Sequence, residues 1–148
     1  MASVRPLHRF RSESGAELIE FALVVPLLLF IISGIIDFGF MFQRYEVVTN
    51  AAREGARIAV LPGYADPDVE ARVRSYMTEG GVANTTSNST VLTTDVPIPV
   101  GAGPAITGKR VQVNYTSPYL FLGPIAGWFG GTFTSANLSG VAIMRNED

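Results

Sequence analysis

The sequence predicts an α+β protein in which one long amino-terminal helix carries a small folded domain. Residues 18–36 form an almost wholly apolar run, LIEFALVVPLLLFIISGII. As a helix this run is nearly as long as the ~30 Å hydrocarbon core of a bilayer. A helical spacing of apolar residues continues to a stop at Pro62 and Gly63, and short alternating segments follow. We therefore divide the 148 residues into a basic leader at 1–15, a transmembrane helix with a helical stalk at 16–62, and an outer domain at 63–148.

Composition excludes several classes of function. The chain has no cysteine, which excludes disulfides, thiolate nucleophiles and cysteine metal sites. Its single histidine, His8, lies in the leader, so the rest of the chain holds no histidine triad and no two-histidine zinc site. The net charge is −2 and no basic cluster follows the apolar run, so nucleic-acid binding is unsupported. We expect no enzymatic activity, no cofactor and no metal.

The apolar run is expected to anchor the chain in a membrane. It holds fourteen Leu, Ile, Val and Phe residues, each worth roughly 0.3–0.6 kcal/mol of insertion free energy. Arg5, Arg9 and Arg11 precede it, which by the positive-inside rule predicts a cytoplasmic amino terminus and an outer domain on the far side. The alternative is a secretory signal peptide. The run is longer than a signal h-region, however, and no small-x-small cleavage site follows it promptly.

The helix continues past the membrane run with an apolar stripe at spacings of three and four, made of Met41, Tyr45, Val48, Ala52, Gly55 and Ala59. Two interpretations stay open for this stripe: it covers the chain's own domain, or it packs laterally against copies or partners. Gly55 costs about 1 kcal/mol relative to Ala in a helix interior, which suggests a packing reason. Pro26 and Gly34 interrupt the membrane run, either as a simple kink or as features of a helix that packs in an assembly.

Glu20 is the unusual residue of the membrane run. It follows a basic leader, Gly15 and four further residues, and it precedes the aromatic Phe21. This arrangement resembles a prepilin peptidase site, which implies cleavage after Gly15 and a new amino terminus at Ala16. In a helical bundle, the buried carboxylate of one subunit would then pair with the new amine of a neighbour, giving affinity and axial register. The alternative is an acid of the first helical turn, favoured by the helix dipole.

Four further motifs follow one another along the chain: GAELIEFALVVPLLL at 15–29, GIIDFG at 34–39, NAAREGAR at 50–57 and the ending at 142–147. Together they resemble the TadE-like family, pseudopilins of the bacterial tight-adherence (Tad) pilus. Phe21 stands where family members often have Tyr.

The resemblance implies a minor pilin-like component in the biogenesis of an adhesive pilus, within a type II–IV secretion-like system. Its implied partners are membrane lipid, other pilin or pseudopilin subunits, a prepilin peptidase and pilus assembly platform proteins, and its implied location is the bacterial inner membrane. The alternative is an unprocessed single-pass membrane protein whose outer domain is a binding or secretion-accessory module.

The outer domain is predicted to hold about one helix and three antiparallel strands, which together with the stalk give a pilin-like outline. Asp66 is a fair N-cap, Pro67 suits the first helical position, and Gly80 ends the helix. Strands are expected at 91–96, 110–116 and 132–145, with Gly140 as a bulge in the last one. The sequence does not predict their order in the sheet.

Residues 118–131, PYLFLGPIAGWFGG, form a second apolar stretch that holds the single Trp of the chain, Trp128. Proline and glycine interrupt it, and it is too short to span a bilayer. Two interpretations stay open: a loop or short helix that covers the core, or an exposed patch for a partner or for lipid.

Overall fold

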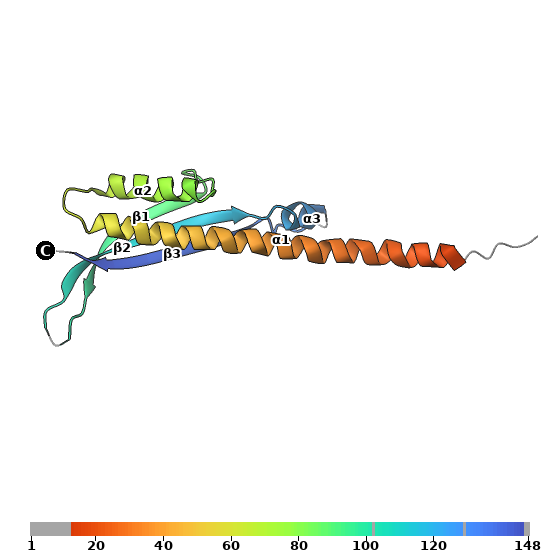
Figure 1. The fold of residues 1–148 in the computed structure, drawn as a ribbon, viewed down its shortest axis with the longest axis horizontal. Helices are drawn as coiled ribbons and strands as arrows, with labels where there is room; N and C mark the ends of the chain where they lie inside the picture. The colour runs from red at the N-terminus through yellow and green to blue at the C-terminus, as the bar shows by residue number, and fades with distance from the viewer. Residues whose placement is uncertain (1–12, 102, 129, 147–148) are drawn as a thin grey trace, which may run out of the picture.

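The predicted α+β fold is confirmed by a computed structural model of the chain, which describes residues 13–101, 103–128 and 130–146. The elements follow in the order α1 (Glu13–Ala59), α2 (Asp66–Glu79), β1 (Ser89–Ile98), β2 (Ile106–Pro118), α3 (Leu122–Trp128) and β3 (Ser135–Arg145). Figure 1 shows α1 as a rod that extends far beyond the rest of the fold at its amino-terminal end.

Helix α1 is a single helix of 47 residues, about 70 Å long at 1.5 Å per residue. It runs without a break through Pro26, so this proline does not divide the helix. The helix ends at Ala59, where a turn begins with a hydrogen bond from the Leu61 amide to the Ile58 carbonyl. Gly63 then takes a positive φ of 90°, which a residue without a side chain adopts readily. The expected division of the chain at residues 15 and 62 stays a prediction.

The three strands form an antiparallel sheet in the order β1-β2-β3. Ser89 pairs with Tyr115 at one end of the β1–β2 ladder, and Gly108 pairs with Arg145 at one end of the β2–β3 ladder. Strands β1 and β2 are longer than the predicted segments because their pairing extends into flanking residues such as Pro97 and Gly108. Strand β3 begins at Ser135, three residues later than predicted. The expected bulge at Gly140 is wrong: Gly140 pairs with Val113 in an unbroken register.

Helix α2 confirms the predicted helix, but its cap differs from the prediction. The N-cap is Ala65 rather than Asp66. The carboxylate of Asp68, at the third position of the helix, accepts a hydrogen bond from the Ala65 amide at 2.9 Å. It thus provides an acceptor for the backbone amide of the N-cap residue. Asp66 instead occupies the first turn, where the helix dipole favours a negative charge.

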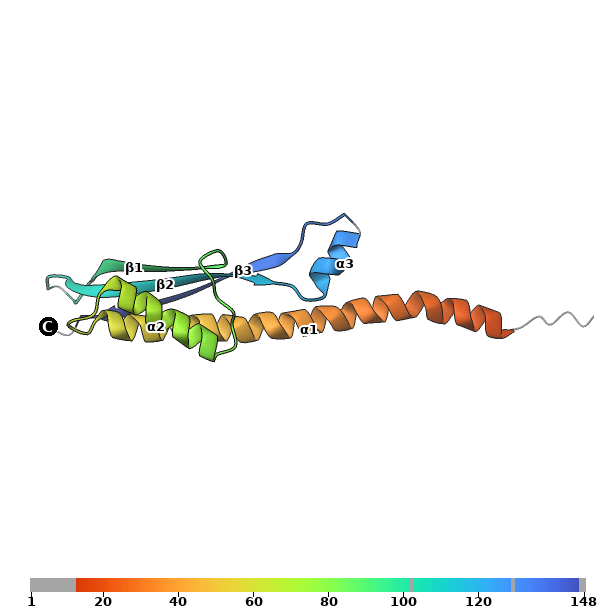
Figure 2. The same ribbon diagram turned by 90° about the horizontal axis from the view of Figure 1, so that it is seen from above.

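The hydrophobic core lies between one face of the sheet, α2 and the carboxy-terminal part of α1. Its buried apolar residues are Val48, Ala51, Ala52, Ala56, Ala59, Val69, Val73, Met77, Val82, Val111, Val113, Tyr115 and Leu138. Helix α1 contacts α2, β2 and β3 along this part, whereas its amino-terminal part projects beyond the domain (Figure 2). The alternation predicted for residues 111, 113 and 115 is confirmed, since all three are buried.

Two glycines let α1 approach its neighbours closely. A Cβ on Gly55 would lie 2.5 Å from Val73 Cγ2 of α2. A Cβ on Gly140 of β3 would lie 2.8 Å from both the Thr49 Cα and the Val48 carbonyl oxygen of α1. Gly55 thus has the packing reason that its helical position suggested, and Gly140 serves close approach. Most of the apolar stripe on the stalk covers the chain's own domain; Tyr45 is an exception and is exposed.

Candidate assembly and membrane surface

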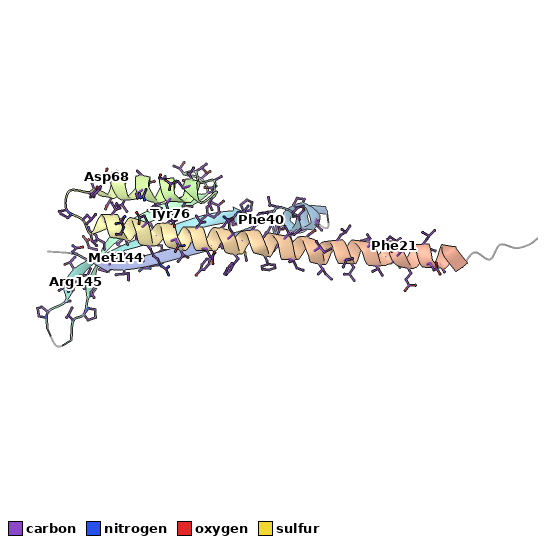
Figure 3. The ribbon with its side chains drawn as sticks, viewed as in Figure 1. Phe21, Phe40, Asp68, Tyr76, Met144 and Arg145 are labelled. Carbon is purple, nitrogen blue, oxygen red and sulfur yellow. The ribbon has the colours of Figure 1, made fainter. Side chains whose placement is uncertain are left out.

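The predicted processing and assembly residues all lie in the first turns of α1. Gly15 is half-buried and Ala16 is exposed. Glu20 is exposed, and its side chain makes no hydrogen bond or ion pair with another residue within 13–101, 103–128 and 130–146. Phe21 is 66% exposed and projects from the bare end of the helix (Figure 3). The leader residues 1–12, including His8 and the three arginines, lie outside the described residues.

The amino-terminal part of α1 exposes large apolar side chains all around the helix. We call residues 18–42 the bare half of α1 and residues 43–59 the covered half. Exposed large apolar residues of the bare half are Leu18, Ile19, Phe21, Leu23, Val24, Leu27, Leu28, Leu29, Phe30, Ile31, Ile32, Ile35, Ile36, Phe38, Phe40 and Phe42. Among the described residues, α1 is the one helix that is long and apolar enough to cross a membrane. None of its most apolar window is buried, so this window takes no part in the core of the domain.

Asp37 is the one acid of the bare half that the protein buries, with 2% of the residue exposed. Its Oδ1 accepts hydrogen bonds from the amides of Leu120 at 2.8 Å and Phe121 at 3.2 Å. Its Oδ2 accepts from the Phe121 amide at 3.0 Å and the Leu122 amide at 2.7 Å. These amides lead into α3, where they have no carbonyl partner within the helix. The carboxyl group of Asp37 therefore fastens the start of α3 to α1.

Arg44 makes a second connection, two helical turns further along the same face. Its Nη1 donates to Ser117 Oγ at 2.9 Å and to the Pro118 carbonyl at 2.8 Å. Its guanidinium also lies over the Phe40 ring, with 5.9 Å from Cζ to the ring centroid. Asp37 and Arg44 together hold residues 117–122 against α1. We call these contacts the clamp.

The TadE-like protein family matches residues 15–57 of this chain. The resemblance seen in the sequence motifs is thus confirmed. The TadE-like segment begins at Gly15 and covers nearly all of α1, while α2, the sheet and α3 lie outside it. The match points to a pilin-like protein associated with the Tad pilus. Comparisons with curated proteins and with solved structures gave no match.

Asp37 is a carboxylate of the TadE-like segment that the domain binds through backbone amides, and the sequence placed it only within a family motif. A signal was present in the sequence. Asp37 is the one charged residue between Glu20 and Arg44, and a carboxylate on so apolar a helix requires hydrogen-bond donors. The donors themselves were hidden, because they are backbone amides more than eighty residues away in the chain.

Glu54 of the TadE-like segment ties α1 to α2. Its carboxylate accepts from Arg57 at 2.9 and 3.1 Å, and its Oε1 accepts from Arg72 of α2 at 3.0 and 3.1 Å. The hydrogen bonds from Arg57, and next those from Arg72, lower the pKa of Glu54 to about 2. This acid therefore stabilises the fold of the domain. The described residues gather no group of three His, Cys, Asp or Glu side chains that would hold a metal ion.

Proposed function

We propose that this chain is a pseudopilin that takes part in the assembly of a Tad-type adhesive pilus. The observation that carries the proposal is the extent of the TadE-like match, which begins at Gly15 and includes the whole bare half of α1. This half is the surface that the chain's own domain leaves uncovered. An uncovered apolar helix suits both storage in a bilayer and later packing against the helices of other subunits.

The proposed processing step is cleavage between Gly15 and Ala16 by a prepilin peptidase, which leaves α1 attached to the outer domain. Glu20 is then the fifth residue of the mature chain. Its carboxylate is exposed at the edge of the apolar surface and lacks a partner among the described residues. An ammonium group at Ala16 of a neighbouring subunit would supply that partner, and pairing in an apolar environment would fix how far one subunit is shifted along the next.

The proposed location is the bacterial inner membrane, with the amino terminus in the cytoplasm and the domain outside. The orientation rests on the arginines of the leader and on the lack of a comparable basic cluster near the other end of the run. The continuity of α1 favours an anchor over a removed signal peptide. A signal peptidase cut after the apolar run would fall inside a helix whose next turns pack in the domain core.

The proposed role is structural rather than enzymatic. Subunit contacts, a processing enzyme, lipid and assembly platform proteins are the partners it requires, and it requires no cofactor. The alternative function is that of an unprocessed single-pass protein whose outer domain binds a partner or assists secretion. In that case the amino terminus of the chain in the cell would retain the leader.

Mass spectrometry of the amino terminus separates these two functions. The chain is produced in its own cells and in a matched strain that lacks prepilin peptidase activity, and the terminal peptide is sequenced from each. We expect a start at Ala16 in the first strain and an uncut leader in the second. An intact leader in both strains, or a start beyond residue 36, would refute the processed pseudopilin.

A further inference from the structure

The apolar surface of α1 continues beyond the predicted membrane run. Phe38 and Phe42 are 57% and 62% exposed, although they follow Asp37 in the chain. The charge of Asp37 does not interrupt this surface, since its carboxyl group is buried under the start of α3. From Phe21 to Gln43 the exposed surface of α1 therefore carries no charged side chain.

The segment that covers Asp37 is itself apolar on its outer side. Residues 118–134 contain no Asp, Glu, Lys or Arg. Leu120, Phe121 and Phe133 are 46%, 45% and 59% exposed. Both ribbon views place α3 directly beside α1, near the middle of its length (Figures 1 and 2). The exposed apolar surface thus passes from α1 onto the segment around α3 without a charged boundary.

The depth of this segment follows from the helical rise. If the apolar span begins at Leu18, then Asp37 lies about 28 Å along the axis and Phe42 about 36 Å. The hydrocarbon core is about 30 Å thick, and the two interfacial layers bring the total to about 40–45 Å. Residues 38–42 and the segment fastened beside them therefore fall in the interfacial layer nearest the domain, a zone in which aromatic rings are favoured.

The segment is also attached to α1 at this level along the helix by several contacts. The clamp joins it to α1 through Asp37 and Arg44. Its two ends are joined to each other by the stacked rings of Tyr119 and Phe133, 4.8 Å apart, and by a hydrogen bond from the Tyr119 amide to the Thr134 carbonyl. A patch with this fixed height, no charge and continuity with a membrane span fits lipid better than it fits a polar protein surface.

We propose that Leu120, Phe121 and Phe133, together with Phe38 and Phe42, form an interfacial foot that inserts into the lipid leaflet nearest the domain. Insertion of the foot fixes the distance between the domain and the membrane. The clamp joins the foot to α1 and to the end of β2, so the sheet is held at the same distance. The proposal rests on α1 crossing the bilayer, and it does not depend on processing or on a role in a pilus.

Spin labelling tests this depth directly, because the chain has no native cysteine. Phe121→Cys and Phe133→Cys place a nitroxide on the foot. Ile143→Cys is the matched control: it is an apolar residue of similar exposure, 53%, on β3. Leu28→Cys marks the membrane span. Each labelled full-length chain is reconstituted in vesicles of phosphatidylcholine and phosphatidylglycerol, and collision rates are measured with oxygen and with a water-soluble nickel chelate.

We expect collisions with oxygen to be more frequent than collisions with nickel at positions 28, 121 and 133. The excess should be smaller at 121 and 133 than at 28. At position 143 we expect collisions with nickel to be the more frequent. Nickel-dominated collisions at both foot positions would overturn the proposal, as would the same result at 28. Low rates for both reagents, with dipolar broadening that disappears on dilution with lipid, would show that a second copy covers the foot and would also overturn it. With Asp37→Ala added, we expect the label at 121 to become more mobile and its oxygen excess to fall.

Discussion

Between residues 43 and 59, α1 buries most of its apolar side chains against α2 and the sheet, whereas between residues 18 and 42 most of its apolar side chains are exposed. The covered half is built from small residues such as Ala52 and Gly55, which let neighbouring elements come close. The bare half is built from Leu, Ile and Phe, which present large apolar surface. One continuous helix thus packs against its own domain on one half and leaves the other half uncovered, for the membrane and the subunits proposed above.

The two ends of the bare half differ in whether the domain binds their carboxylate. Near the start of the bare half, Glu20 is exposed. Near its end, Asp37 is satisfied by three backbone amides. The carboxylate of Asp37 accepts hydrogen bonds within the chain and so stabilises the fold. The carboxylate of Glu20 is exposed on an apolar helix and is available to bind another molecule. Variants in the two halves are expected to separate assembly from folding.

The largest expected effect is the loss of pilus assembly in Glu20→Ala. The domain lies far from Glu20, so cleavage, membrane insertion and the free energy of unfolding should stay unchanged. Glu17→Ala is the matched control, since Glu17 is also exposed in the first turns of α1 but precedes the apolar run. Electron microscopy of pili and mass spectrometry of the amino terminus supply the readouts. Normal piliation in Glu20→Ala would contradict the proposed pairing of Glu20 with the Ala16 amine of a neighbouring subunit.

The next effect concerns close packing on the covered half. Gly140→Ala places a Cβ against the α1 backbone, which cannot move aside as a side chain can. We expect the free energy of unfolding to fall by about 3 kcal/mol. Gly39→Ala is the control from the bare half, where a Cβ meets nothing within 4 Å; it should be neutral or slightly stabilising. Urea unfolding of the full chain in detergent micelles measures both, and equal effects would contradict the comparison.

Asp37→Ala should loosen the clamp, because it leaves three amides near α3 without an acceptor. We expect a local cost of about 2 kcal/mol. Hydrogen exchange followed by mass spectrometry should show faster exchange at residues 120–122, with little change in the core strands. Asp37→Asn keeps one side-chain oxygen as an acceptor, so it should accelerate amide exchange at residues 120–122 less than Asp37→Ala does. Exchange that is unchanged in both variants would show that the clamp contributes nothing to holding α3.

The smallest effect is the pH dependence of the covered half. The pKa of Glu54 is lowered from 4.5 to about 2 in the folded chain. Its contribution is therefore complete above pH 4.5 and is lost as the pH falls towards 2. We expect Glu54→Gln to lower the free energy of unfolding by about 1 kcal/mol at pH 7, because both arginines are partly exposed. The difference from the unaltered chain should vanish near pH 2, and a difference that persists there would contradict the assignment.

The sequence predicted well those elements that depend on local pattern. The helix through residues 16–59 followed from apolar spacing, and the middle strand followed from alternation at 111, 113 and 115. The cap of α2 was placed one residue late because Asp66 and Asp68 are both acids, and only the geometry shows which of them reaches an amide. Gly140 was misread because a bulge and a close approach by another element favour the same residue.

The contacts of the site were less accessible to prediction because they join distant parts of the chain. Gly15, Ala16, Glu20 and Phe21 form a local motif, so their interest was visible in the sequence. Asp37 and residues 120–122 meet only once the sheet has returned the chain to the middle of α1. The apolar stretch around α3 was recognised as unusual, but its level along α1 is a property of the folded chain.

The unbroken course of α1 through Pro26 has a directional consequence. Glu20 and Asp37 are 17 positions apart in the sequence, and at 3.6 residues per turn their side chains point in directions that differ by about 100°. Because α1 is one continuous helix between these two residues, the helical repeat fixes this angle approximately. A subunit that docks at Glu20 would therefore approach from about a quarter turn away from α3. Two neighbours, one protein and one lipid, would then be held on separate sides of the same rod.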